Sequence, residues 1–380
     1  MAKEKTKDPY RKLTKIMIVL LVLAVLLAVA WFLLDQYSKG QHADAQAKID
    51  AENEQLIEDY EQKVAERKKL ALQKPETEMP SPKAQGWDIL DMSDYPVEGS
   101  TEVTTDRVDS LQGGLMLLNR WHGLPGDFSI VEKEIVSVME VSDYSIPVSG
   151  RDVKLFPNAI QAFKNFLDYA KEEHNLEYYI VRGGYRTMNQ QTEYWNNEIQ
   201  RYPNREGDGL IEAARRNVSF PGTSDYQSGL SFQVDIYSRD DSVINTTKFQ
   251  TSPQAELLNN EGWKFGIVFR FPAQNYPYPD TVDKDYATGI DNARLQMDAY
   301  RYVGIPHAAV MHIKGFCLEE YIDFLIEHPH IQVFEDGALK YEIYRIPETG
   351  QEQKHIIPDN AADFFVSTDN MGGLVAAISY

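Results

Sequence analysis

The residues best suited to chemistry lie in three short blocks between residues 183 and 308. Their sequences are GGYRTMNQQ, PGTSDYQSGLSFQVDI and MDAYRYVGIPHA, in chain order. In the first block, Arg186 offers a planar guanidinium that can bind both oxygens of a peptide carboxylate. The same side chain could instead form a salt bridge that supports its loop. In the second block, Ser224 has no paired base at a recognisable spacing, so it is not predicted to be a nucleophile.

Together the three blocks resemble the VanY-type D-alanyl-D-alanine carboxypeptidases, zinc enzymes that trim the stem peptide of bacterial peptidoglycan. In that family the second block carries a zinc-binding His and Asp in a pattern close to SxHxxGxAxD. The third block carries the catalytic Glu and the last His ligand, close to ExWHxRYVG. The resemblance covers residues 113–325 and, more loosely, the residues that follow. It implies a zinc peptidase fold and a peptide substrate.

At the positions that the resemblance assigns to chemistry, this chain carries other residues. Tyr226 replaces the first His, Ala299 replaces the last His, and Gln296 replaces the catalytic Glu. A phenol with an ordinary pKa of about 10 is a poor zinc ligand at neutral pH. A glutamine amide cannot accept a proton. With Asp235 as the one usable ligand left, we expect no metal and no intact catalytic residue; zinc is expected only if the ligands have been relocated.

The spacing around Asp235 differs from that of the family. The family has about seven residues from the first His to the Asp, whereas Asp235 follows Tyr226 by nine. Two extra residues preserve the alternation of a strand, so a β-bulge could keep Asp235 facing inward. The positions of Gln296 and Ala299 are set by the Arg-Tyr-Val-Gly motif at residues 301–304. We therefore predict that Tyr226, Asp235, Gln296 and Ala299 converge in one cleft.

Further substrate-binding positions follow from the resemblance. It implies that Arg186 lies at the rim of the cleft and that Gln191, Ser224 and Gln227 belong to the substrate pocket. His307 and His312 lie near the third block, but residues five apart do not share a helix face well. We predict that both histidines are packing or surface residues.

The N-terminal region predicts a membrane anchor. Residues 16–34 are 19 uncharged, almost wholly apolar positions, which as a helix span about 28 Å, close to the hydrocarbon thickness of a bilayer. Residues 1–15 carry a net charge of +4, which favours a cytoplasmic tail and an extracellular C-terminal part in the cell membrane. A cleaved signal peptide is the alternative, since Ala28-Val-Ala30 fits a cleavage site. Because Trp31 continues the apolar run, we expect a retained single-pass anchor.

Residues 35–86 predict a spacer helix followed by a proline-containing linker. Within 41–73 a short apolar stripe is compatible with a homodimeric coiled coil or with a solvated spacer. The domain resembling the carboxypeptidases is expected at 87–330, and a β-rich extension packed on it at 331–380. A net charge of −20 argues against nucleic acid as a partner. The single cysteine, Cys317, excludes an internal disulfide framework.

Hydrophobic periodicity predicts an α+β fold, with an antiparallel sheet and flanking helices rather than βαβ units. Helices are expected at 157–174, 188–200, 210–216, 253–262 and 318–327. Strands are expected at 178–182, 231–237, 263–271, 331–334, 339–346, 364–367 and 374–378.

Three hypotheses on function follow. The first is a membrane-anchored, extracellular pseudoenzyme that binds peptidoglycan stem peptide or an envelope protein without hydrolysis. The second is an active zinc carboxypeptidase with relocated ligands. The third is a structural module of an envelope assembly.

Overall fold

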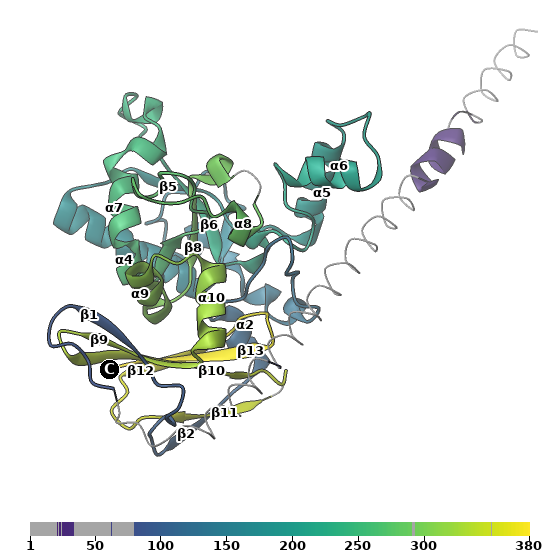
Figure 1. Cartoon of the computed structure of the whole chain (residues 1–380). Coiled ribbons are helices and arrows are strands. Elements are labelled where there is room, and N and C mark those ends of the chain that lie inside the picture. The colour runs from purple at the N-terminus through teal and green to yellow at the C-terminus, as the bar shows by residue number, and fades with distance from the viewer. Residues whose placement is uncertain are drawn as a thin grey trace, which may run out of the picture. The chain divides into compact units, whose positions relative to one another are not determined.

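The computed structural model describes residues 21, 23, 25–33, 62, 80–290, 293–350 and 352–380, without the side chains of 293 and 294. The chain divides into two units, Met1–Ala51 and Glu52–Tyr380. The second unit contains two principal sheets, one of five strands and one of four, with helices packed against them (Figure 1). A mixed fold with antiparallel sheets is thus confirmed, although there are two main sheets rather than one.

The five-stranded sheet joins the two ends of the second unit. Its order is β1-β9-β10-β13-β12, and every neighbouring pair is antiparallel. The strands are β1 (Trp87–Asp91), β9 (His330–Glu335), β10 (Ala338–Pro347), β12 (Asp363–Thr368) and β13 (Gly373–Ser379). The β-rich segment predicted from residue 331 therefore shares a sheet with the strand that begins at Trp87.

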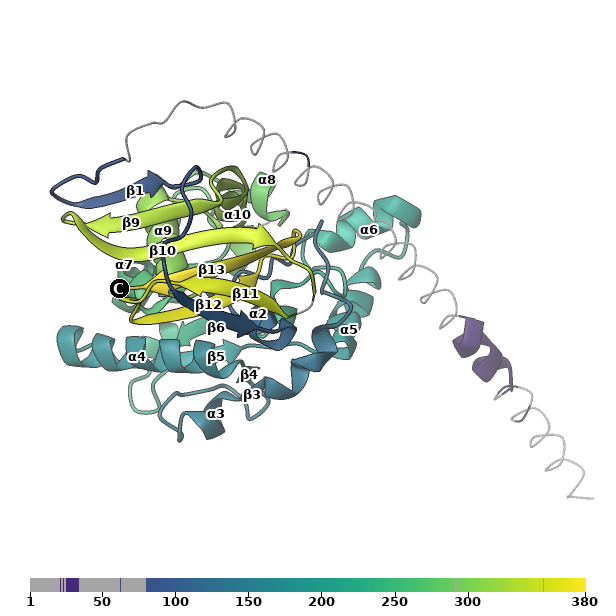
Figure 2. The ribbon, with the colours of Figure 1, turned by 90° about the horizontal axis from the view of Figure 1, so that it is seen from below.

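Both faces of this sheet are covered. Along β13, Val375 and Ala377 belong to one apolar cluster, and Leu374, Ala376 and Ile378 to another, as strand alternation requires. The first face carries α9 (Ile305–Lys314) and α10 (Leu318–Glu327), which lie on the side of the other sheet (Figure 1). The opposite face is covered by β2 (Thr101–Thr105) and β11 (Gln353–Ile357), which pair with each other (Figure 2).

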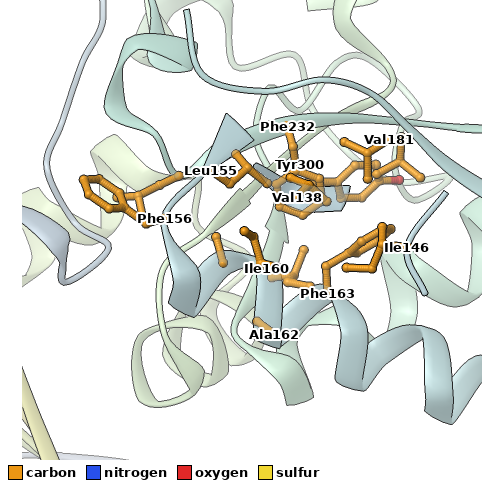
Figure 3. Packing of buried hydrophobic residues seen from close by; sticks show 14 of the residues in the cluster. Val138, Ile146, Leu155, Phe156, Ile160, Ala162, Phe163, Val181, Phe232 and Tyr300 are labelled. Carbon is orange, nitrogen blue, oxygen red and sulfur yellow. The ribbon is translucent and has the colours of Figure 1, made fainter. Parts of the chain in front are cut away.

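The four-stranded sheet has the order β5-β6-β8-β7 and is also antiparallel. Its strands are β5 (Tyr179–Gly183), β6 (Ser231–Ile236), β7 (Ile267–Phe269) and β8 (Ala299–Tyr302). The apolar stripe of α4 (Pro157–His174) packs against it. Figure 3 shows Ile160 and Phe163 of this helix below Phe232 and Tyr300 of the sheet.

Shorter elements connect and flank the sheets. They are the helices α2 (Arg107–Gln112), α3 (Val138–Val141), α5 (Met188–Ile199), α6 (Gly207–Arg215), α7 (Pro253–Glu261) and α8 (Asp285–Thr288), and the strand pair β3 (Val136–Ser137) and β4 (Lys154–Leu155). Within the described residues there are also seven 3-10 helices: η1 (Phe128–Ile130), η2 (Glu132–Glu134), η3 (Asp225–Ser228), η4 (Ile244–Thr246), η5 (Phe249–Thr251), η6 (Gly262–Phe265) and η7 (Ala293–Gln296).

One segment expected to be a strand is partly helical. The strand expected at 263–271 begins as η6, and only β7 within it is extended. Gly266 separates the two with φ +79°, a left-handed conformation that a glycine adopts without strain. Trp263, in the part that is not extended, serves packing, because its ring stacks on His312 at 4.7 Å between centroids.

Much of the predicted N-terminal organisation lies outside the described residues. This holds for the tail 1–15, for part of the span 16–34, and for 41–73 apart from residue 62. Residues 21, 23 and 25–33 are helical. Within the described part of the chain, no helix has both the length and the apolar content that a bilayer crossing requires.

Candidate ligand-binding site

The second and third sequence blocks meet where β6 lies beside β8. Tyr226 belongs to η3, which ends at Gly229 with φ +73° before β6 begins. A Cβ at Gly229 would lie 2.9 Å from Ile135 and 3.0 Å from Phe156, so only glycine fits this turn. In the ladder of β6 and β8, Gln233 is the direct partner of Ala299. Tyr226 packs in one apolar cluster with Ala299, so the three positions converge.

The structure corrects the assignment of Asp235. Strand β6 pairs with β8 in continuous register, and the register shift with β5 falls at Arg182, on the β5 side. No bulge in β6 therefore absorbs two extra residues. Gln233, seven residues after Tyr226, faces the cavity, while Asp235 lies two residues further along, roughly 6.6 Å at 3.3 Å per residue. The Asp235 carboxylate instead forms an ion pair with Arg182 at 2.5 Å.

A cavity of about 220 Å³ opens over these positions. Its lining combines residues from α5 and the loop before it, from β6 and the segment before it, from the segment after β7, and from η7. The lining residues are Arg186, Tyr194, Asn217, Val218, Ser219, Ser224, Asp225, Tyr226, Gln233, Phe271, Leu295 and Gln296. Of the predicted site residues, Arg186, Ser224, Tyr226 and Gln296 line this cavity, and Ala299 lies beneath it.

Arg186 is held between two aromatic rings. Its guanidinium carbon lies 4.2 Å from the ring centroid of Tyr226 and 4.9 Å from that of Tyr194. Its Nη1 donates to Oε1 of Gln191 at 3.4 Å. No ion pair of Arg186 is recorded within the described part of the chain, so its charge faces the cavity uncompensated. The alternative role of Arg186, a salt bridge that supports its loop, therefore finds no carboxylate partner among the described residues.

Tyr226 brings a polar group that the protein leaves unused. The residue is 4% exposed, and its hydroxyl has no hydrogen-bond partner among the described residues. Burial raises the pKa of this phenol far above its ordinary value. It therefore stays protonated and can donate a hydrogen bond throughout the ordinary pH range. Beside it, burial raises the pKa of Asp298, which is hydrogen-bonded to Gln233.

Gln191 and Gln227 support the site rather than line it. Nε2 of Gln191 donates to the carbonyl oxygen of Ser219 at 2.7 Å. This hydrogen bond holds the segment 217–219, which lines the cavity. Oε1 of Gln227 accepts from the amide of Gly222 at 2.7 Å. Both side chains are buried, and neither is among the lining residues.

The two histidines in or near the third block, His307 and His312, serve packing. His307 is fully buried, its Nδ1 lies 2.7 Å from the Tyr321 hydroxyl, and burial lowers its pKa to about 3. His312 is stacked on Trp263. Neither lines the cavity.

The residues at the family's metal positions do not fit zinc. Hydrolytic zinc is held by three ligands drawn from His, Cys, Asp and Glu, with a water in the fourth position. Here Tyr226, Gln233 and Ala299 supply a high-pKa phenol, an amide and a methyl group. Among the residues with described side chains, no group of three or more His, Cys, Asp or Glu could hold a metal ion.

Below the cavity lies a buried ion network. Oδ1 of Asp225 accepts from Nη1 of Arg301 at 2.8 Å and lies 3.2 Å from Nε of Arg270. Arg270 in turn forms a two-bond pair with Glu319, at 2.8 and 2.9 Å. Burial alone would raise the pKa of Asp225, but the two arginines hold it below its ordinary value. The Asp225 carboxylate therefore stabilises the fold above the ordinary aspartate pKa of about 3.9, and this is lost on acidification.

Several of these residues escaped the sequence interpretation. Gln233 could have been found, because it alone keeps the seven-residue spacing from Tyr226. Tyr194, Arg270 and Glu319 had no motif to reveal them, since they come from elements outside the three blocks.

Comparison with known proteins shows which family this chain resembles. A family model described as VanY, D-alanyl-D-alanine carboxypeptidase, matches residues 152–283. A D-alanyl-D-alanine carboxypeptidase of Enterococcus faecium is 27% identical over 286 residues, which cover 74% of this chain and 80% of the relative. Residues 152–283 therefore carry a VanY-type carboxypeptidase domain. A putative carboxypeptidase of Bacillus subtilis, YodJ, is 26% identical over 209 residues, covering 55% of this chain and 67% of its own.

A solved structure supports the fold of the VanY-type domain. The vancomycin resistance D,D-dipeptidase VanXYg, in complex with a D-Ala-D-Ala phosphinate analog, superposes with a TM-score of 0.55 at 21% identity. The match covers 74% of this chain and 99% of that chain. At this identity the likeness shows the fold alone.

The ion network predicts a large cost for removing one carboxylate. In Glu319→Gln, Arg270 keeps its charge in a buried site with half its compensation gone, and we expect the free energy of unfolding to fall by about 3 kcal/mol. Denaturant unfolding of the full chain measures this. Asp168→Asn is the control, because it breaks the 2.7 Å pair with Lys164 on the exposed face of α4 and should cost about 0.3–0.5 kcal/mol. Equal effects of the two changes would contradict the structural role of the network.

Proposed function

We propose that this chain is a non-hydrolytic VanY-type protein that binds the carboxylate end of a peptide, such as the peptidoglycan stem peptide. One observation carries the proposal. The positions for metal and base hold Tyr226, Gln233, Ala299 and Gln296, whereas Arg186 remains in the cavity without a carboxylate partner among the described residues. A site that has lost its reaction groups and kept its anion-binding group is suited to binding alone.

The charge of the cavity supports a carboxylate ligand. Asp225 lies at the floor, but Arg270 and Arg301 already compensate it. The amides of Asn217, Gln233 and Gln296 are neutral donors and acceptors that suit a peptide backbone. Since the whole chain carries −20, an anionic ligand must be bound by this local positive charge rather than by the overall field.

The alternatives have less support. The relatives in the family are named as enzymes, so an active zinc carboxypeptidase with relocated ligands is the second candidate. It would need histidines near the cavity, whereas His307 contacts Tyr321 and His312 stacks on Trp263. An envelope protein as ligand, or a role as an assembly module without a small ligand, would leave the unpaired Arg186 unexplained.

We further propose that residues 16–34 anchor the domain at the outer face of the cell membrane, where wall peptides are found. The support comes from the apolar run and the basic flank alone. A coiled coil through 41–73 would make the anchored protein a dimer.

Binding and hydrolysis can be separated experimentally. Calorimetric titration of the full chain with acetylated Lys-D-Ala-D-Ala should show binding, without release of D-alanine and without tightly held zinc. Arg186→Ala should weaken binding about 10- to 100-fold, the value of charge-assisted hydrogen bonds. Arg182→Ala is the matched control, because this arginine lies four residues away and pairs with Asp235. Chelator-sensitive release of D-alanine would establish the active enzyme instead.

The corrected register predicts which substitutions rebuild a metal site. Tyr226→His, Gln233→Asp and Ala299→His together place two His and one Asp on the converging positions, so the triple variant should bind zinc in a calorimetric titration. The double variant that keeps Gln233 should not, because Asp235 lies too far along β6. Activity need not return in the triple variant, since small errors of geometry cost catalysis heavily. Equal zinc binding by the two variants would restore Asp235 as the ligand position.

The anchor has its own test. Protease added to intact cells should digest the VanY-type domain, while the protein stays in the membrane fraction until it is cleaved. A mature N-terminus at or just after Ala30 would show that the segment is a signal peptide and would remove the anchor from the proposal.

A further inference from the structure

A buried hydroxyl without a partner is an unusual feature of a folded protein. Buried polar groups are nearly always hydrogen-bonded, and an exception calls for a missing partner. Among the cavity-lining residues, Tyr226 meets this description. It is 4% exposed, its hydroxyl has no hydrogen-bond partner among the described residues, and it lines the cavity.

Packing fixes where this hydroxyl lies. The residue packs in one apolar cluster with Ala299, Phe271 and Ala273, and the Arg186 guanidinium lies over the ring with its carbon 4.2 Å from the ring centroid. The backbone adds a constraint, because the amide of Arg186 donates to the carbonyl oxygen of Tyr226 at 3.2 Å. A phenol donor and a guanidinium donor are thus held next to each other by contacts that involve no ligand.

The two donors together suit an oxygen-rich ligand end. A guanidinium has several N–H groups and no acceptor, and a protonated phenol adds one O–H donor. The C-terminus of a peptide presents two carboxylate oxygens, and the residue before it presents an amide carbonyl oxygen. The cavity of about 220 Å³ is smaller than the roughly 300–1,000 Å³ of sites that enclose whole drug-sized ligands, so it fits the end of a chain.

We propose that the Tyr226 hydroxyl is a ligand-recognition group that donates a hydrogen bond to an oxygen of the peptide end whose carboxylate Arg186 binds. This rests on the proposed function. Tyr226, at the first metal position, then contributes to ligand binding, because it supplies a hydrogen-bond donor where the family supplies a metal ligand. The ligand class that follows is a peptide with a free C-terminal carboxylate and small terminal residues.

The variant Tyr226→Phe tests this assignment. It keeps the ring, its apolar contacts and the stacking with Arg186, and removes only the hydroxyl. Titration of the full chain with acetylated Lys-D-Ala-D-Ala should show a dissociation constant about five- to tenfold higher than that of the native protein, the value of one neutral hydrogen bond. The same tripeptide with a C-terminal amide should bind the native protein at least tenfold more weakly, because it lacks the anion.

Thermal unfolding separates recognition from a structural role. Because the hydroxyl has no internal partner, Tyr226→Phe should unfold at the native temperature or above it. Tyr179→Phe is the control: this buried hydroxyl donates to the carbonyl oxygen of Gln254 at 3.1 Å, so its loss should lower the unfolding temperature and leave the dissociation constant within twofold.

The outcomes are distinct. If the native protein binds the tripeptide and Tyr226→Phe binds it equally well, or if Tyr226→Phe lowers the unfolding temperature as Tyr179→Phe does, the role of the hydroxyl is wrong and the proposed function stands. If the native protein does not bind the tripeptide, the proposed function fails, and the assignment of Tyr226 fails with it.

Discussion

The arrangement of the site depends on two buried arginines that share one aspartate. Asp225 lies in η3, Arg301 in β8 and Glu319 in α10, and Arg270 directly follows β7. Each of the four has a fully or almost fully buried side chain. Burying such charges is tolerable only when each is closely paired, so the elements can assemble in essentially one arrangement. Arg301 also donates to the carbonyl oxygens of Gly114 and Met116. These two hydrogen bonds attach the segment 114–116 to the ion network.

This ion network also determines the charge of the cavity above it. Asp225 is the neighbour of Tyr226 in η3, and an uncompensated carboxylate there would neutralise Arg186. Because Arg270 and Arg301 compensate Asp225 from below, the cavity keeps a single positive charge. The apolar packing of Tyr226 with Ala299, Phe271 and Ala273 adds further contacts that hold these segments together.

The sequence predicted the elements better than their register. The apolar stripe of α4 and the short apolar run of β13 are visible in the sequence, and both elements appear within a residue of the expected bounds. The placement of Asp235 could not be obtained in the same way, because alternation gives the same face to Gln233 and Asp235. Which of them lies beside Ala299 is decided by pairing with β8 and by the extra residue of β5 at Arg182, and both are long-range features. The ion network was missed for the same reason, since its members are up to 94 positions apart in the chain.

The pairing of β1 with β9 affects how the domain can be isolated. The family match begins at residue 152, yet Trp87 and Ile89 of β1 pack into the same cluster as α9 and α10. A fragment that started after Asp91 would leave β9, with its buried Ile331 and Val333, as the free border of the five-stranded sheet. Such a border offers unpaired amides and carbonyls beside apolar side chains, which favours edge-to-edge aggregation. A fragment that keeps the five-stranded sheet intact therefore begins more than sixty residues upstream of the recognisable family domain.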